Sequence, residues 1–155
     1  TVSFDVNHRA KLWDEREARP VLCELLVAAD VVFAGPEEAS IVLDDGGTPL
    51  ELARALAARG PREAVVKDGA RGCVAVIDGE EHRAGAVAVD VVDPVGAGDA
   101  FVAGYLAERL AAAPPERRLA TAVAAGACAV TVPGDCEGLP WPADLAALAG
   151  GDVVR

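Results

Sequence analysis

The chain has 155 residues, about one domain's worth, and 52% of them are apolar, much of that share being Ala and Val. Its formal net charge of −11 argues against binding to nucleic acid or to an acidic membrane surface, because both require a basic face. We find neither an apolar run of the roughly 18 residues that a membrane span needs nor a signal-peptide pattern. A cytoplasmic protein is therefore expected.

The strand and helix signals alternate along the chain. They are a strand at 1–6, a helix at 15–29, a strand at 31–34, helices opening at Pro36 and at Pro49, strands at 63–67, 73–77 and 80–89, helices at 97–112 and 119–132, and a short helix at 144–149. Pro20 is expected to begin the better-formed part of its helix. This order predicts an α/β fold, a mainly parallel sheet with one antiparallel hairpin and a cover of helices.

Local signals fix several of these boundaries. Residues 48–51 form a capping box with proline at the first helical position, and the helix they open is expected to run to Arg59 and stop at Gly60. Asp78 and Gly79 predict a hairpin turn. The helix at 119–132 has small residues all round, which predicts tight packing on the sheet, with a flat ligand slot beside it as the alternative.

The four cysteines, Cys23, Cys73, Cys128 and Cys136, are scattered and form no C-x-x-C pair. We therefore expect buried, reduced thiols and no zinc site. The chain contains no Met and opens at Thr1 on a strand-like run. For these reasons it is expected to be a fragment or excised region of a longer protein.

The stretch at 93–101 combines a glycine-containing turn with the start of an apolar helix, and an alternating apolar run at 86–92 leads into it. Free N–H groups at a helix start carry partial positive charge, and Gly96 and Gly98 let the backbone approach a ligand closely. Such a turn can hold phosphate oxygens, and Asp99 could accept a proton from an attacking hydroxyl. The pattern thus points to phosphoryl transfer to an alcohol. The alternative is an ordinary strand-to-helix turn that Asp99 caps.

Further polar turns follow the other strands. Residues 67–72 form a glycine turn at the carboxyl end of a strand, where ligands collect in open α/β sheets, although a simple solvated turn is the alternative. The Arg9 guanidinium could donate a pair of hydrogen bonds to a phosphate or a carboxylate, and the alternative is a surface ion pair. His8 and His82 are interpreted as surface residues. Glu38 lies at a helix start, where capping is the default role and holding a metal's water shell the alternative.

Together these residues resemble the ribokinase-like (PfkB) carbohydrate kinases over essentially the whole chain. Residues 93–99 resemble the C-terminal signature of that family, 67–72 its ATP-contacting turn, and 35–38 its N-x-x-E motif, with Gly35 where many members have Asn. Within the family, 3–13 and 134–140 look most like 2-keto-3-deoxygluconate kinases.

The resemblance implies a three-layer α/β/α fold and ATP-dependent phosphorylation of a sugar or sugar acid, with Mg²⁺ as cofactor. Asp99 would deprotonate the substrate hydroxyl, and the N–H groups of Gly96, Ala97 and Gly98 would form the anion hole. Asp135 would touch the sugar acid. The residues implied at the nucleotide site are Asn7, Arg9, Lys67, Gly69 and Gly72, and Glu38 would help to place Mg²⁺ through water.

Family members are about twice this length, so we expect this chain to carry the nucleotide-binding part and the base, and to lack the lid and most of the sugar pocket. Such a chain is expected to be inactive alone, and its uncovered edges could favour a homo-oligomer. Two alternatives stay open: a non-catalytic nucleotide-binding module, and another family member such as a ribokinase, fructokinase or nucleoside kinase.

Overall fold

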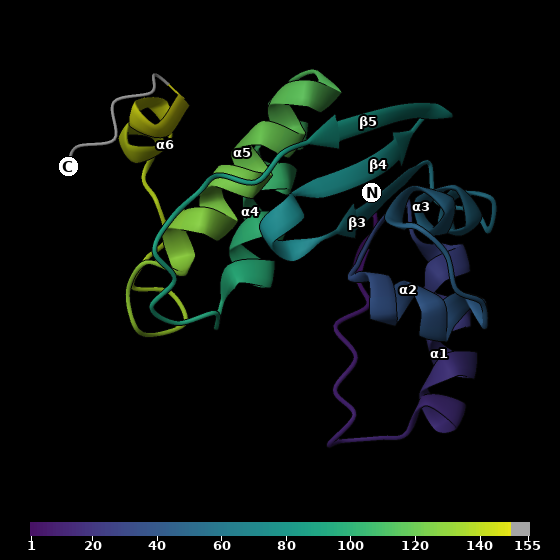
Figure 1. Ribbon diagram of the computed structural model, residues 1–155. Coiled ribbons are helices and arrows are strands. Elements are labelled where there is room, and N and C mark those ends of the chain that lie inside the picture. Colours follow the sequence, from purple (N-terminus) through teal and green to yellow (C-terminus); the bar gives the residue numbers. More distant parts are fainter. Residues whose placement is uncertain (150–155) are drawn as a thin grey trace. The chain divides into compact units, whose positions relative to one another are not determined.

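The computed structural model describes residues 1–149, which form two compact units (Figure 1). The first unit contains Thr1–Gly69 and Cys73–Arg83. The second contains Ala70–Gly72 and the chain from Ala84 onward. Each unit carries part of the chemistry that the sequence predicts, and each is described by itself.

A five-stranded mixed sheet runs in the order β1-β2-β3-β4-β5. Its strands are β1 (Ser3–Asp5), β2 (Val31–Ala34), β3 (Glu63–Lys67), β4 (Cys73–Ile77) and β5 (Glu80–Ala84). Strands β1, β2 and β3 are parallel, whereas β4 is antiparallel to β3. The carboxyl ends of the three parallel strands therefore meet at one edge of the sheet, and the turns after them become neighbours.

The hairpin turn forms as predicted, because Asp78 and Gly79 both have positive φ, at 50° and 87°. The returning strand is shorter than expected, ending at Ala84 and not at residue 89. The alternating run that follows is no strand, because Val92 N–H donates to the carbonyl of Val130 at the end of a helix, at 2.8 Å. A period-two pattern alone does not reveal which partner the backbone will find.

The helices of the first unit are α1 (Glu15–Ala28), α2 (Pro36–Leu43) and α3 (Pro49–Ala57). One side of the sheet packs with them into an apolar core, in which alternate strand residues meet helix leucines and valines. This core includes Val32, Ala34, Ala64, Val66 and Val76 from the strands and Leu22, Leu26, Val42, Leu52 and Leu56 from the helices.

Helix boundaries follow the capping residues. In α3 the capping box is confirmed, since Thr48 N–H donates to Glu51 Oε2 at 2.8 Å. The expectation for Pro20 was wrong: α1 already begins at Glu15, where Asp14 Oδ1 accepts from Glu17 N–H at 2.9 Å. This cap stabilises a full turn before the proline, which sits inside the helix.

The second unit contains α4 (Ala97–Leu110), α5 (Pro115–Ala129) and α6 (Pro142–Ala149). Helix α5 begins four residues before the expected Leu119, because Pro115 suits the first helical position. Its small residues pack tightly against α4 (Figure 1), as a Cβ added to Gly104 would lie 3.1 Å from Ala125 Cβ. This small-residue helix therefore packs closely against α4 within the second unit.

All four cysteines are free, but their surroundings differ. Cys73 is buried, as expected, and partial burial raises the pKa of the Cys128 thiol. Cys136 is exposed, so the expectation that all four are buried was wrong. Over residues 1–149, no helix combines the length and the apolarity that a bilayer crossing requires.

Candidate active site

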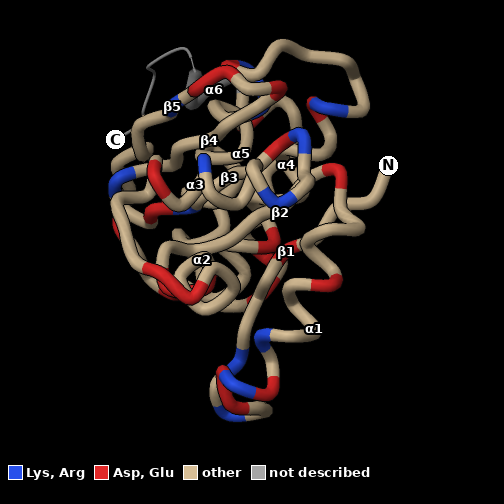
Figure 2. The backbone as a smooth tube through the Cα atoms, turned by 90° about the vertical axis from the view of Figure 1, so that its right-hand side faces the viewer, with Lys and Arg blue, Asp and Glu red and all other residues tan. Residues whose placement is uncertain are grey.

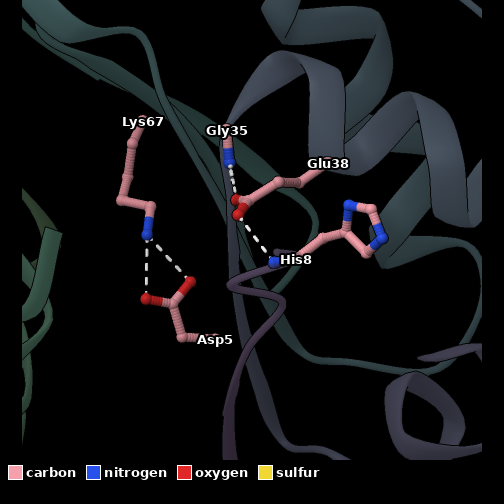
Figure 3. Close-up of polar contacts among 5 residues, drawn as sticks. All are labelled: Asp5, His8, Gly35, Glu38 and Lys67. Atoms are coloured by element: carbon pink, nitrogen blue, oxygen red, sulfur yellow. Dashed lines mark hydrogen bonds and ion pairs between the residues drawn. The ribbon is translucent and has the colours of Figure 1, made fainter. Parts of the chain in front are cut away.

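The carboxyl edge of the parallel strands holds a set of polar groups in the first unit, which we call the sheet-edge set: Asp5, Asn7, Arg9, Gly35, Glu38, Lys67 and Gly69. Lys67 Nζ, at the end of β3, lies 2.8 and 2.9 Å from the two carboxylate oxygens of Asp5, at the end of β1 (Figure 3). Both side chains are largely buried, at 19% and 18% exposure. The ion pair spans β2 and fixes the Lys67 ammonium at this edge.

Glu38 connects two turns of the sheet-edge set. Its Oε2 accepts from Gly35 N–H at 2.7 Å, and its Oε1 accepts from His8 N–H at 3.0 Å (Figure 3). The first bond caps α2, so the capping interpretation is confirmed. The second reaches across to the turn after β1, a partner that the sequence pattern did not reveal.

Asn7 and Arg9 flank His8 in that turn, and both are exposed. Asn7 has a φ of 42°, a left-handed conformation that a non-glycine residue rarely adopts. His8 and His82, which were expected at the surface, are each partly buried and partly exposed. His8 Nε2 is a buried atom without a hydrogen-bond partner among the described residues. Composition alone could not show this, because the tertiary fold decides how far a histidine is buried.

The two glycines expected at the nucleotide site have different surroundings. Gly69 is exposed, with a φ of 54° and open space where a Cβ would lie. Gly72 belongs to the second unit and is buried, and a Cβ there would lie 2.1 Å from the carbonyl oxygen of Ala84. A packing requirement therefore explains Gly72 without any ligand, whereas Gly69 presents its backbone to solvent.

The start of α4 presents free N–H groups. Gly96 is the N-cap residue with a φ of 77°, and the N–H of Ala100 donates to its carbonyl at 2.9 Å. No described residue accepts from the N–H groups of Ala97, Gly98 or Asp99. The Asp99 side chain is exposed and bonds to none of residues 1–149, so the structure gives no support to the alternative that it caps the helix.

A loop that follows α5 packs against this turn. Asp93 Oδ1 accepts from Val95 N–H at 3.1 Å and its Oδ2 accepts from Gly134 N–H at 3.3 Å. A Cβ at Gly96 would lie 2.2 Å from the carbonyl oxygen of Asp135. The fold thus brings Asp135, which is exposed, to the turn that starts α4, and Asp93 holds the two segments together. Sequence analysis assigned no role to Asp93.

The sheet-edge set offers little direct coordination for a metal. Residues 1–149 contain no cluster of three or more His, Cys, Asp and Glu side chains that could hold an ion. Mg²⁺, however, usually keeps several waters and needs only one or two carboxylates besides substrate phosphates. Each Glu38 oxygen has a further lone pair beyond its N–H bond, so this residue fits a contact made through water.

Charge around these turns is mixed. The segment from the turn after β1 into α1 carries Arg9, Lys11 and Arg16 beside Asp14 and Glu15. In the view of Figure 2, Lys and Arg positions are interspersed with Asp and Glu along the tube. Positive potential for an anion must therefore come from individual groups in each unit, such as, in the second unit, the N–H groups at the start of α4.

The second unit therefore has a glycine turn that opens α4 and an exposed aspartate in the first turn of that helix. Residues 1–142 match the profile of the pfkB family carbohydrate kinases, and the chain belongs to that family. The resemblance read from residues 93–99, 67–72 and 35–38 is thereby confirmed, as is the ribokinase-like α/β fold class.

Three relatives show how far the similarity extends. A 2-dehydro-3-deoxygluconokinase of Thermoproteus tenax is 36% identical over 94% of this chain and 45% of its own length. A fructokinase of Klebsiella pneumoniae is 37% identical over 93% of this chain and 49% of its own length. The crystal structure of a candidate Ribokinase II from Escherichia coli with ATP and Mg²⁺ superposes with a TM-score of 0.87 at 29% identity, covering 97% of this chain and 48% of that one. The chain thus spans about half the length of these relatives.

Proposed function

We propose that this chain is the C-terminal, nucleotide-binding and base-carrying part of an ATP-dependent kinase that phosphorylates 2-keto-3-deoxygluconate or a closely similar sugar acid. The observation that carries the proposal is the start of α4, where free N–H groups adjoin an exposed carboxylate. The Thermoproteus tenax relative supports the acceptor, because its name refers to the same sugar acid. The E. coli structure supports ATP as the donor.

In the proposed reaction, the oxygen of a substrate hydroxyl attacks the γ-phosphorus of ATP. The bond between that phosphorus and the bridging oxygen of ADP breaks, and the hydroxyl proton passes to the Asp99 carboxylate. The N–H groups of Gly96, Ala97 and Gly98 donate to the oxygens of the transferring phosphoryl group. Fixed donors of this kind need no reorganisation during the reaction, which is why a helix start suits the role.

The remaining residues bind and orient the substrates in this proposal. Asn7, Arg9, Lys67 and Gly69 are assigned to the nucleotide, and the buried Gly72 is assigned to the shape of the same turn. Asp135 is assigned to the sugar acid, which is consistent with its contact to Gly96. Glu38 would hold Mg²⁺ through water, and the ion would neutralise phosphate charge when bound. The half of the relatives that this chain does not match would supply most of the sugar pocket, so the chain alone is proposed to be inactive.

The role of Asp99 is tested in the whole reading frame that contains this chain, with a coupled assay for ADP. Asp99→Asn keeps the size of the side chain but removes the base, and kcat should fall by about 10²- to 10⁴-fold. Asp90→Asn is the control, since Asp90 is also exposed, lies outside α4 and should leave kcat unchanged. A kcat of Asp99→Asn close to that of the wild type would exclude the assigned role.

A second acceptor class deserves a direct comparison, because the Klebsiella pneumoniae fructokinase is as similar as the sugar-acid kinase. The same assay should therefore compare kcat/KM for 2-keto-3-deoxygluconate, fructose, ribose and a nucleoside. We expect the sugar acid to be preferred; a preference for fructose would move the proposal to the second class. ATP binding without turnover on any acceptor would favour the non-catalytic module.

A further inference from the structure

Glu38 holds together two backbone turns that lie 30 residues apart in the sequence. Its two carboxylate oxygens accept from Gly35 N–H at the start of α2 and from His8 N–H in the turn after β1 (Figure 3). We call these two hydrogen bonds the Glu38 bridge. Both are part-buried and charge-assisted, and bonds of that kind are stronger than bonds between neutral groups.

The turn that the bridge holds contains a strained residue. Asn7 has a φ of 42°, a left-handed conformation that asparagine tolerates better than most residues with a side chain but that is still sparsely populated. Strain of this kind persists only where the surroundings over-determine the conformation. The residue before Asn7 is fixed, since Val6 N–H donates to Phe33 O at 2.9 Å, and the residue after it is fixed by Glu38. Asn7 therefore sits between two anchors, of which only the Glu38 bridge is a side-chain contact.

From this geometry we infer that Glu38 is a positioning residue, which holds Asn7 and Arg9 in the conformation that receives the nucleotide phosphates. The inference rests on the proposed function, because that function assigns Asn7 and Arg9 to the nucleotide. It goes beyond a contact to hydrated metal, since Glu38 acts here on the polypeptide before any ligand binds. Preorganisation of this kind lowers the conformational cost of binding.

The neighbouring carboxylate provides a matched control. Glu37 precedes Glu38 in the first turn of α2, but its side chain is exposed and bonds to none of the described residues. Glu37→Gln removes the same charge from the same helix start and leaves the bridge intact. Any effect that Glu38→Gln shares with Glu37→Gln is therefore an effect of charge, and the remainder belongs to the bridge.

The first measurement needs neither ATP nor magnesium. Amide hydrogen exchange of His8 and Gly35 is compared in the whole protein and in Glu38→Ala, Glu38→Gln and Glu37→Gln. We expect exchange of both amides to accelerate about tenfold or more in Glu38→Ala, because both acceptors are lost. Glu38→Gln keeps one carbonyl acceptor, so at least one of the two amides should accelerate, and this isosteric variant serves if Glu38→Ala does not fold. Unchanged exchange at His8 in both Glu38 variants would overturn the inference.

The second measurement separates positioning from a role at the metal. The KM for ATP is measured at saturating Mg²⁺, and the Mg²⁺ concentration for half-maximal rate is measured at saturating ATP. We expect Glu38→Gln to raise the KM for ATP about tenfold even at saturating Mg²⁺, where a weaker contact to the hydrated ion no longer limits the rate. Faster exchange with an unchanged KM, or a raised magnesium requirement alone, would contradict the positioning role. Because exchange is measured without substrates, it shows whether the Glu38 bridge protects the two amides even if the Asp99 test overturns the proposed function.

Discussion

Single residues were predicted best where their partners are close in the sequence. The capping box at Thr48 and Glu51 involves residues three apart, and the structure confirms it. The contacts of Glu38 with His8 and of Asp93 with Gly134 join residues 30 and 41 positions apart, and no spacing rule reaches that far. The sequence therefore identifies the kind of residue at the candidate site, and the fold determines which backbone group it binds.

Gly96 combines a positive φ with a close neighbour, so we expect its substitution to destabilise the turn that starts α4. In Gly96→Ala, the new Cβ would overlap the carbonyl of Asp135 and the residue would keep a strained φ of 77°. The free energy of unfolding should fall by about 2 kcal/mol or more. Chemical denaturation of the whole protein measures this loss.

Gly46→Ala is the control for that measurement, because a Cβ at Gly46 meets nothing within 4 Å. Its effect should stay within about 1 kcal/mol, and a slight stabilisation is expected from the lower entropy of the unfolded chain. Equal effects of the two substitutions would mean that the contact between Gly96 and Asp135 does not constrain the turn.

Whole elements were predicted well in type and less well at their ends. Strands β2, β3 and β4 have the predicted bounds, since short apolar runs next to turn residues mark them, with Glu63 and Lys67 at the two ends of β3. The carboxyl end of β5 differs from the prediction because the Val92 N–H binds the carbonyl of Val130 and no neighbouring strand. The start of α5 differs from the prediction because the helix already begins at Pro115. The end of β5 was therefore missed because a tertiary hydrogen bond decides it, whereas the start of α5 was missed although the proline that begins it is a local signal.

The contribution of the α3 capping box to the free energy of unfolding depends on pH. Hydrogen bonds from the Thr48 backbone and side chain lower the pKa of Glu51 in the folded state. A carboxyl group whose pKa is lower in the folded than in the unfolded state stabilises the fold above its unfolded pKa. That contribution is lost as the pH falls through the folded pKa.

Glu51→Gln should therefore destabilise the protein at pH 7, and the difference from wild type should shrink as the pH falls below the ordinary pKa of glutamate. Urea denaturation of both proteins, in steps from pH 7 towards pH 4 and lower, measures this difference. Glu24→Gln, on the exposed face of α1, is the control and should show no such trend. A difference that stays constant over the whole pH range would show that the Glu51 charge is not what caps the helix.

At the scale of the molecule, the proposed catalytic parts are divided between two units. The sheet-edge set lies in the first unit, and the start of α4 with Asp135 lies in the second. The chain spans about half the length of its relatives, and the proposed sugar pocket belongs mainly to the other half. The possible homo-oligomer, the cytoplasmic location and the inactivity of the isolated chain stay predictions. Activity must therefore be measured on the whole reading frame.

The most direct measurement follows the phosphorus atom itself. The whole protein is incubated with ATP, Mg²⁺ and 2-keto-3-deoxygluconate, and the product is followed by ³¹P NMR. We predict a new phosphomonoester signal that grows with that of ADP, requires the sugar acid and disappears in Asp99→Asn. A phosphomonoester that forms equally fast in Asp99→Asn, or none with any sugar acid, sugar or nucleoside, would contradict the assignment of this chain to phosphoryl transfer through Asp99.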